Sequence, residues 1–137
     1  MIKAAIVGLG WWGKTLVEAV ATSDAIRFVA GATRTASPET TAFAEAQQLR
    51  LVASYEALLA DPGVDAVVLA TPHSLHTRQV VGAAASGKHV FCEKPFALTR
   101  ADAQAAVDAV KKAGVTMGLG DNRRFHPEMT KLREQIR

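Results

Sequence analysis

One short glycine-rich segment near the start of the chain constrains the fold more than any other part of the sequence. Residues 8 to 15 have the sequence GLGWWGKT, which fits two phosphate-binding patterns at once. As Gly8-x-Gly10-x-x-Gly13, the segment has the spacing that places a dinucleotide pyrophosphate on the start of a helix. As Gly8-x-x-x-x-Gly13-Lys14-Thr15, it is a P-loop for a nucleoside triphosphate and its Mg²⁺. The surrounding sequence must decide between the two.

The rest of the chain alternates short apolar runs with helical patterns, which is typical of βαβ units around a parallel sheet. These runs are apolar on both sides, so we expect helices on both faces of the sheet. The sequence therefore predicts an α/β fold of the Rossmann type, a doubly wound parallel sheet. The expected strands are Ile2 to Val7, Ile26 to Ala32, Arg50 to Ala53, Ala66 to Ala70, His89 to Cys92 and Val115 to Leu119.

Local signals indicate where several helices begin and end. Ser37 before Pro38 is an N-cap followed by proline at the first helical position. Thr99 and Asp102 resemble a capping box, and Gly114 is suited to end the helix that they begin. Apolar residues at helical spacing predict two more helices, over Tyr55 to Ala60 and Leu75 to Ala85.

This context favours the dinucleotide pattern over the P-loop. The segment follows a strand that begins at residue 2 and opens a helix. In that setting Gly8 makes the tight turn, Gly10 lets the backbone approach the pyrophosphate, and Gly13 lets the helix pack on the strand. A P-loop also needs an acidic residue after a second apolar strand to hold Mg²⁺. The nearest candidate, Glu93, is followed at once by Lys94-Pro95. We therefore expect Lys14 and Thr15 to be ordinary residues of the first helical turn.

The residues after the second strand bear on which dinucleotide is bound. An NAD-binding domain carries an acidic residue there, which holds the ribose 2′-hydroxyl. This sequence has Thr33-Arg34-Thr35 instead and no acidic residue before Glu39. Arg34 can offer a 2′-phosphate a planar fork of donors, with the hydroxyls of Thr33 and Thr35 beside it. We predict NADP as the cofactor, with NAD as the alternative and a solvated loop residue as the simpler explanation of Arg34.

Polar residues follow two further predicted strands, at the carboxyl ends where function gathers in a doubly wound sheet. The fourth strand leads into Thr71-Pro72-His73, and the fifth leads into Glu93-Lys94-Pro95. With these residues in place, the chain resembles the Gfo/Idh/MocA oxidoreductase family, the relatives of glucose-fructose oxidoreductase and inositol dehydrogenase. The matching segments, in the family's order, are GLGWWG, VDAVVLATPHSLH, GKHVFCEKPFALT and NRRFHPEM, and the Glu-Lys-Pro is the most specific part.

The resemblance implies an N-terminal Rossmann domain that binds NAD(P), and hydride transfer to or from a hydroxyl-bearing carbon of a sugar, a polyol or a related small molecule. It places Glu93 and Lys94 beside the nicotinamide and its ribose. Lys94 would be the catalytic residue, because an ammonium that reaches the substrate oxygen can stabilise a developing alkoxide or join a proton relay. Pro95 is expected to form a cis peptide bond with Lys94.

The resemblance also assigns roles to residues around the cofactor. Thr71 and Pro72 look like the turn that runs past the ribose and nicotinamide, and His73 stands where the family often has asparagine. His76 matches a recurrent histidine, for which local packing at a helix start is as good an explanation as a role near the cofactor. We expect no metal site at these histidines, because they lack carboxylate or cysteine partners.

The two tryptophans of the glycine-rich segment are expected to differ in role. Trp12 resembles the aromatic residue often found before the third glycine in this family and is predicted to pack as part of the fold. Trp11 lies where its amide and indole could flank the pyrophosphate.

Length is the largest departure from the family, whose members continue into a second domain that supplies most of the substrate pocket. The 137 residues allow a dinucleotide-binding domain over residues 1–120 and the start of a connection over 121–137, which ends in a polar helical stretch from residue 128. We expect the second, substrate-binding domain to be absent, little turnover from this chain alone, and a homo-oligomer for the full-length protein. Two other functions remain open: a free-standing nucleotide-binding or regulatory module, and NAD-dependent glycoside cleavage.

Composition limits the partners. The formal charge is +3, but lysine and arginine are spread along the chain, so a nucleic-acid partner is not expected. The first strand begins at once, leaving no room for a signal peptide, and no apolar run approaches the ~20 residues of a membrane helix. A single cysteine, Cys92, excludes an internal disulfide. We therefore predict a cytoplasmic protein that does not bind membranes.

Overall fold

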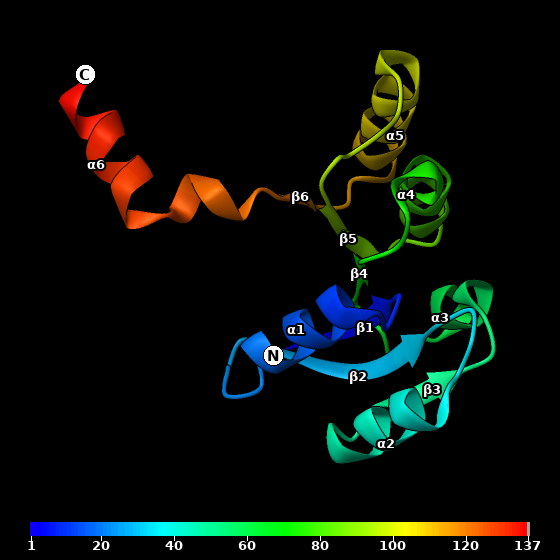
Figure 1. Cartoon of the computed structure of the whole chain (residues 1–137). Coiled ribbons are helices and arrows are strands. Elements are labelled where there is room, and N and C mark those ends of the chain that lie inside the picture. Colours follow the sequence, from blue (N-terminus) through cyan, green and yellow to red (C-terminus); the bar gives the residue numbers. More distant parts are fainter. Residues whose placement is uncertain (137) are drawn as a thin grey trace.

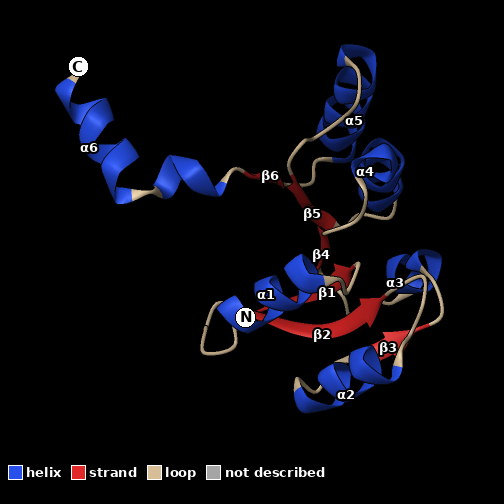
Figure 2. Ribbon diagram, viewed as in Figure 1, coloured by secondary structure: helices blue, strands red, loops and turns tan. Residues whose placement is uncertain are grey.

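A six-stranded sheet forms the centre of the molecule, as seen in a computed structural model that describes residues 1–136 (Figures 1 and 2). All neighbouring strands are parallel, and their order is β3-β2-β1-β4-β5-β6. This is the doubly wound order of a Rossmann fold, which the sequence predicted. The strands are β1 (Ile2–Val7), β2 (Ile26–Ala32), β3 (Arg50–Val52), β4 (Ala66–Leu69), β5 (His89–Glu93) and β6 (Met117–Gly120).

Helices connect successive strands, and each expected helix is present. The α-helices are α1 (Trp11–Ala19), α2 (Pro38–Ala46), α3 (Tyr55–Ala60), α4 (His76–Ala85), α5 (Arg100–Ala113) and α6 (Pro127–Gln135), with short 3₁₀ helices η1 (His73–Leu75) and η2 (Asn122–Phe125).

The predicted helix signals are confirmed in detail. The Ser37 hydroxyl accepts a hydrogen bond from the Thr40 amide at 3.2 Å and caps α2. The Thr99 hydroxyl accepts from the Asp102 amide at 3.1 Å and caps α5. Gly114 ends α5 in the left-handed conformation, with a φ of 68°. These caps satisfy amides that would otherwise have no partner in the helix.

Several element boundaries differ from the prediction: β3 and β4 end one residue earlier than expected, and β5 and β6 end one residue later. The helix expected from Leu75 begins as the 3₁₀ turn η1 and becomes α-helical only at His76. The last strand begins at Met117, two residues later than expected, and just before it the Thr116 amide donates to the His89 ring nitrogen at 3.0 Å. Side-chain and turn hydrogen bonds of this kind compete with regular structure at element ends.

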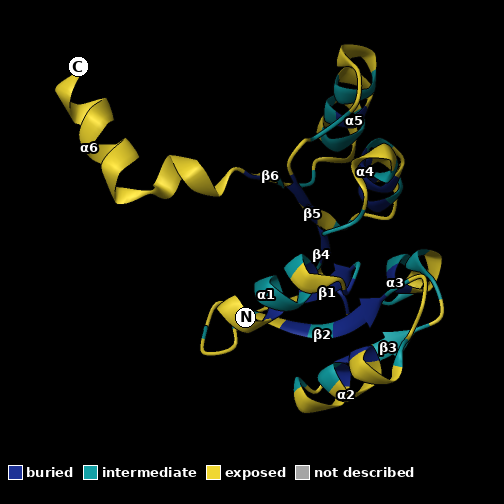
Figure 3. Cartoon of the chain, in the orientation of Figure 1, coloured by how far each residue is buried: buried dark blue, intermediate teal, exposed yellow. Residues whose placement is uncertain are grey.

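Two apolar layers, one on each face of the sheet, make up the core. On one face Leu58 of α3, Val80 of α4 and Ala106 of α5 pack on alternate strand residues. On the other face, Val17 of α1 and Ala44 of α2 pack on the strand residues that point to that face. Helices therefore cover both faces, as expected from strands that are apolar on both sides. Figure 3 shows the strands of the sheet largely buried.

The C-terminal helix α6 stands apart from the sheet (Figures 1 and 3). Residues of α6 are exposed, including its apolar residues Met129 and Leu132, each 49% exposed. It spans Pro127–Gln135, where a helical stretch over residues 128–137 was expected, and Arg137 lies outside the described residues. Within residues 1–136, no helix combines the length and apolar character needed to span a bilayer.

Candidate functional site

A cleft of about 550 Å³ opens at the carboxyl edge of the sheet. It lies where the chain leaves β1 toward one side and β4 toward the other, which is the place where open α/β sheets bind ligands. It reaches the ends of β1, β2 and β4 and the starts of α3 and α4. The lining residues are Val7, Gly8, Leu9, Gly10, Ala32, Thr33, Arg34, Ala53, Ser54, Tyr55, Ala70, Thr71, Pro72, Leu75 and Gln79.

The three glycines of the opening segment have different surroundings. Gly8 has a φ of +94°, and a Cβ there would lie 2.5 Å from the Ala70 carbonyl oxygen. A Cβ on Gly13 would lie 1.9 Å from the Gly8 carbonyl oxygen. A Cβ on Gly10 would meet nothing within 4 Å. The fold itself requires glycine at positions 8 and 13, whereas Gly10 leaves open space over the loop, as a dinucleotide pyrophosphate requires.

The start of α1 faces this open space. Gly10 is the N-cap and supplies no side-chain oxygen, so no side chain caps the first-turn amides. Uncapped amides at a helix start favour an anion. Trp11 is 78% exposed at this point and Trp12 is half-buried, with ring centroids 5.4 Å apart. The pair thus divides into one exposed ring and one ring packed into the fold.

The segment after β2 contributes a cation to the cleft. Thr33 and Arg34 line the cleft, whereas Thr35 lies outside its lining, in the exposed loop toward α2. Arg34 is exposed, and none of the hydrogen bonds or ion pairs within residues 1–136 involves its guanidinium. The guanidinium is therefore available to a ligand anion at this end of the cleft.

Another part of the cleft is lined by Tyr55, Thr71 and Gln79, which form a hydrogen-bonded group that the sequence did not indicate. The Thr71 hydroxyl donates to the Gln79 side-chain oxygen, and the Tyr55 hydroxyl donates to the Gln79 carbonyl, both at 2.5 Å. Burial raises the pKa of Tyr55 above its usual range, so its hydroxyl stays a donor at neutral pH. Tyr55 and its neighbour Ser54 follow β3, so the strand-end rule could have found them, but nothing marked Gln79.

His76 joins the turns that follow β4 and β5. Its ring is 1% exposed; Nδ1 lies 2.9 Å from the Pro95 carbonyl oxygen, and Nε2 lies 2.9 Å from the Thr71 carbonyl oxygen. His76 is absent from the cleft lining, as is His73, which is exposed in η1. The geometry makes His76 a buried link that fixes Thr71 and Pro95 relative to each other.

The Glu93-Lys94-Pro95 segment leaves the end of β5. Glu93 is buried, and its Oε2 accepts from the Lys94 amide at 3.3 Å. A Cβ on Gly120 of β6 would lie 2.5 Å from Glu93 Oε1, so this glycine gives the carboxylate its space. Lys94 is exposed, and its peptide bond to Pro95 is cis, as predicted. The carboxylate is thus held inside the fold while the ammonium reaches outward.

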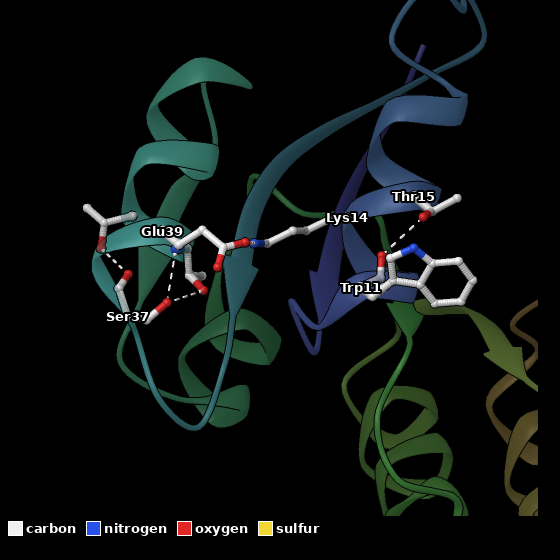
Figure 4. Close-up of polar contacts among 7 residues, drawn as sticks. Trp11, Lys14, Thr15, Ser37 and Glu39 are labelled. Carbon is white, nitrogen blue, oxygen red and sulfur yellow. Dashed lines mark hydrogen bonds and ion pairs between the residues drawn. The ribbon is translucent and has the colours of Figure 1, made fainter.

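Lys14 takes a position that the sequence did not predict. Thr15 is the ordinary helical residue expected, since its hydroxyl donates to the Trp11 carbonyl at 3.1 Å. Lys14 instead extends from α1 and pairs with Glu39 in the first turn of α2 (Figure 4). Glu39 is the first acidic residue after β2, and folding brings it beside the glycine-rich segment.

Comparison with known proteins gives a family match over most of the chain. The sequence model of the protein family described as "Oxidoreductase family, NAD-binding Rossmann fold" matches residues 2–121. The oxidoreductase YrbE of Bacillus subtilis is 34% identical over 96% of this chain, and the alignment covers 39% of YrbE. A myo-inositol 2-dehydrogenase of Thermotoga maritima is 42% identical over 58% of this chain and is covered over 24% of its own length.

A solved structure of a relative has the same fold over nearly the whole chain. The scyllo-inositol dehydrogenase of Lactobacillus casei, determined with NAD(H) and scyllo-inositol, has a TM-score of 0.90 and 25% identity. The match covers 99% of this chain and 41% of that one. The chain therefore spans about two fifths of the length of relatives that match it throughout.

Proposed function

The chain belongs to the Gfo/Idh/MocA oxidoreductase family, and we propose that it binds NADP(H) in a protein that transfers hydride to or from a hydroxyl-bearing carbon of a sugar or polyol. Residues 2–121 are an NAD(P)-binding Rossmann domain. The main support for the proposal is the open space at Gly10. This space lies between the uncapped start of α1 and a cleft that runs along the ends of β1, β2 and β4.

The cofactor would lie across the carboxyl edge of the sheet. Its pyrophosphate would rest on the first-turn amides of α1, with Trp11 beside it. Its adenosine would occupy the end of the cleft near Arg34, and its nicotinamide would extend past Thr71 and Pro72 toward Lys94. The bound cofactor would supply the hydride acceptor or donor, and the chain would hold its reactive ring at the end of β5.

Lys94 is the residue that we assign to the chemical step. It follows a buried carboxylate and a strand end, so its backbone position is fixed while its ammonium remains exposed. A cation there would stabilise negative charge on the substrate oxygen as a carbonyl or alkoxide forms. His73 is exposed next to Pro72, and His76 links the turns that follow β4 and β5.

The preference for NADP rests on charge. Thr33 and Arg34 line the cleft where an NAD-binding domain would carry a carboxylate. A guanidinium can hold a 2′-phosphate in a bidentate manner, and the absent carboxylate removes repulsion. Thr35, outside the cleft lining, would add its hydroxyl only from the loop toward α2.

We place the end of the cofactor domain at Gly120, where β6 ends. The segment that follows, η2 and α6, would lead toward a substrate-binding domain and an oligomer interface. The relatives' greater length and the separation of α6 from the sheet support this assignment. Sugar or polyol substrates are proposed because inositol dehydrogenases are among the relatives.

Titration of the 137-residue chain with NADPH, NADH and ATP, followed by tryptophan fluorescence, tests the proposal. Both tryptophans lie at the start of α1, so a dinucleotide bound there should change their emission. We expect NADPH to bind more tightly than NADH, and ATP to bind weakly. Tight ATP binding without NADPH binding would refute the dinucleotide site, and equal affinities for the two dinucleotides would refute the NADP preference.

A further inference from the structure

A second, smaller hollow adjoins the dinucleotide cleft on its α2 side. Its volume is about 470 Å³, and Leu9 and Gly10 line both spaces. Lys14 and Glu18 line it from α1, one and two helical turns beyond Gly10, and Glu39 and Thr40 line it from α2. The two spaces therefore meet at the glycine where the fold leaves room for the cofactor.

Lys14 is held in this hollow by its surroundings. Its ammonium pairs with Glu39 and lies 5.5 Å from the centre of the Phe43 ring, within cation–π range. Its side chain is only 18% exposed, because its stem passes between the two helices (Figure 4). A cation in this position is already oriented before any ligand arrives.

Glu39 is placed quite differently. Its side chain is 84% exposed, so it reaches the lysine from the solvent side. Its hydrogen bond and charge interaction with Lys14 lower the pKa of this carboxyl, so it is an anion at neutral pH. An exposed carboxylate can turn away at little cost, because surface ion pairs contribute little to stability. The hollow thus contains a fixed cation and a displaceable anion.

We propose that Lys14 is a specificity-determining residue, which exchanges Glu39 for the 2′-phosphate of NADP. The inference rests on the proposed dinucleotide site, and it places the 2′-substituent of a cofactor that passes Gly10 in this hollow, which meets the cleft at Leu9 and Gly10. The phosphate and Glu39 compete for the Lys14 ammonium, so replacing Lys14 and replacing Glu39 should have opposite effects on NADP binding. NAD has a 2′-hydroxyl in that place, so its binding should be insensitive to both replacements.

Calorimetric titration with adenosine 2′,5′-bisphosphate and adenosine 5′-monophosphate isolates the 2′-phosphate. At low ionic strength, Lys14→Gln should weaken bisphosphate binding about tenfold, the usual size for a lost charge-assisted hydrogen bond. Lys14→Arg should retain most of the affinity. Glu39→Gln should strengthen bisphosphate binding about threefold or more, because the competing anion is gone. Binding of the monophosphate should change less than about twofold in all three.

Matched variants control for net charge. Lys111→Gln, at an exposed position of the distant helix α5, and Glu45→Gln, on the exposed side of α2, should leave both affinities unchanged. Melting curves would show that each variant folds.

Three results would overturn the inference. Unchanged bisphosphate binding by Lys14→Gln would remove the lysine from the site while leaving the dinucleotide proposal intact. Weaker NAD⁺ binding by Glu39→Gln would mean that Glu39 holds the ribose hydroxyl instead. A wild-type chain that binds neither NADP⁺ nor NAD⁺ would overturn the dinucleotide site and this inference together.

Discussion

Replacing His76 with alanine should destabilise the fold and loosen the site at once. The ring is 1% exposed and contacts the Thr71 and Pro95 carbonyl oxygens, each at 2.9 Å. Because both partners are acceptors, a neutral ring donates a hydrogen bond to only one of them. Alanine removes that hydrogen bond and the contact with the second oxygen, and it leaves a ring-sized void between α4 and the two turns. Pro95 follows Lys94, so the substitution also frees the segment that carries the proposed catalytic ammonium.

The size of the effect follows from these contacts. The hydrogen bond that a neutral ring can donate contributes about 1 kcal/mol. The void left by the ring adds roughly 1 to 2 kcal/mol, at the low end of large-to-small core substitutions because the turns can partly collapse. We therefore expect a loss of about 2 to 3 kcal/mol in the free energy of unfolding. His76→Asn, whose amide can donate to one turn, should lose about half as much.

Urea unfolding at neutral pH, followed by far-UV circular dichroism, measures the loss, and NADPH titration of the folded variant measures the effect on the site. His73→Ala is the control, because His73 is exposed and should change stability by less than about 0.5 kcal/mol. The argument would be refuted if His76→Ala were as stable as the control. It would also fail if His76→Asn and His76→Ala were equally destabilised while NADPH binding stayed at the wild-type level.

Other substitutions separate residues that serve the fold from residues that serve the ligand. Gly13→Ala should cost about 3 kcal/mol of stability, because its Cβ would overlap the backbone, whereas Gly10→Ala should melt like the wild type yet bind NADPH more weakly. The reverse ranking in melting curves would contradict this. Trp11→Ala should weaken NADPH binding more than the fold, because the ring is 78% exposed, and Trp12→Ala should do the opposite; thermal melts and titrations of both decide it. Cys92 should resist iodoacetamide at pH 8 until urea unfolds the chain, because burial raises the pKa of its thiol to about 12, and fast labelling of the folded chain would disprove its burial. The same raised pKa means that this thiol's contribution to stability is complete below about pH 9 and declines as the pH rises toward 12, which alkaline urea titrations would detect.

Most of the fold could be predicted because its signals are local. Strand β1, strand β2 and helix α3 have the bounds expected from apolar runs and turn residues. The caps at Ser37 and Thr99 act over three residues, so their chemistry is visible in the sequence itself. The boundaries that differ from the prediction do so by one or two residues, as at the start of β6, where the Thr116 amide donates to the His89 ring.

Which candidate residues lie at the carboxyl edge of the sheet could be predicted, because it depends only on the ends of strands. The glycine-rich segment, Thr33-Arg34, Thr71-Pro72 and Glu93-Lys94-Pro95 all follow strands, and parallel strands bring their carboxyl ends to one edge. Thr35, by contrast, was assigned to the same cluster by adjacency alone, and the loop carries it away from the cleft lining.

Residues on helices could not be placed in this way. Gln79 points its amide at Thr71 only because α4 packs against the end of β4. His76 could have packed locally or faced the cofactor, and its two carbonyl partners are 5 and 19 residues away in the sequence. Lys14 and Glu39 are 25 residues apart and belong to different helices. Their pairing depends on how α1 and α2 lie against one face of the sheet.

The sequence by itself determined the parallel sheet, the glycine-rich turn and the family, because periodicity, caps and glycine spacing act over a few residues and need no knowledge of packing. The tertiary structure alone decided which glycine leaves room for a ligand, which histidine joins two turns, and which carboxylate lies beside the only lysine of the first helix. Each of these depends on groups that approach within a few ångströms only after the helices have packed. No single segment of the sequence specifies such a contact.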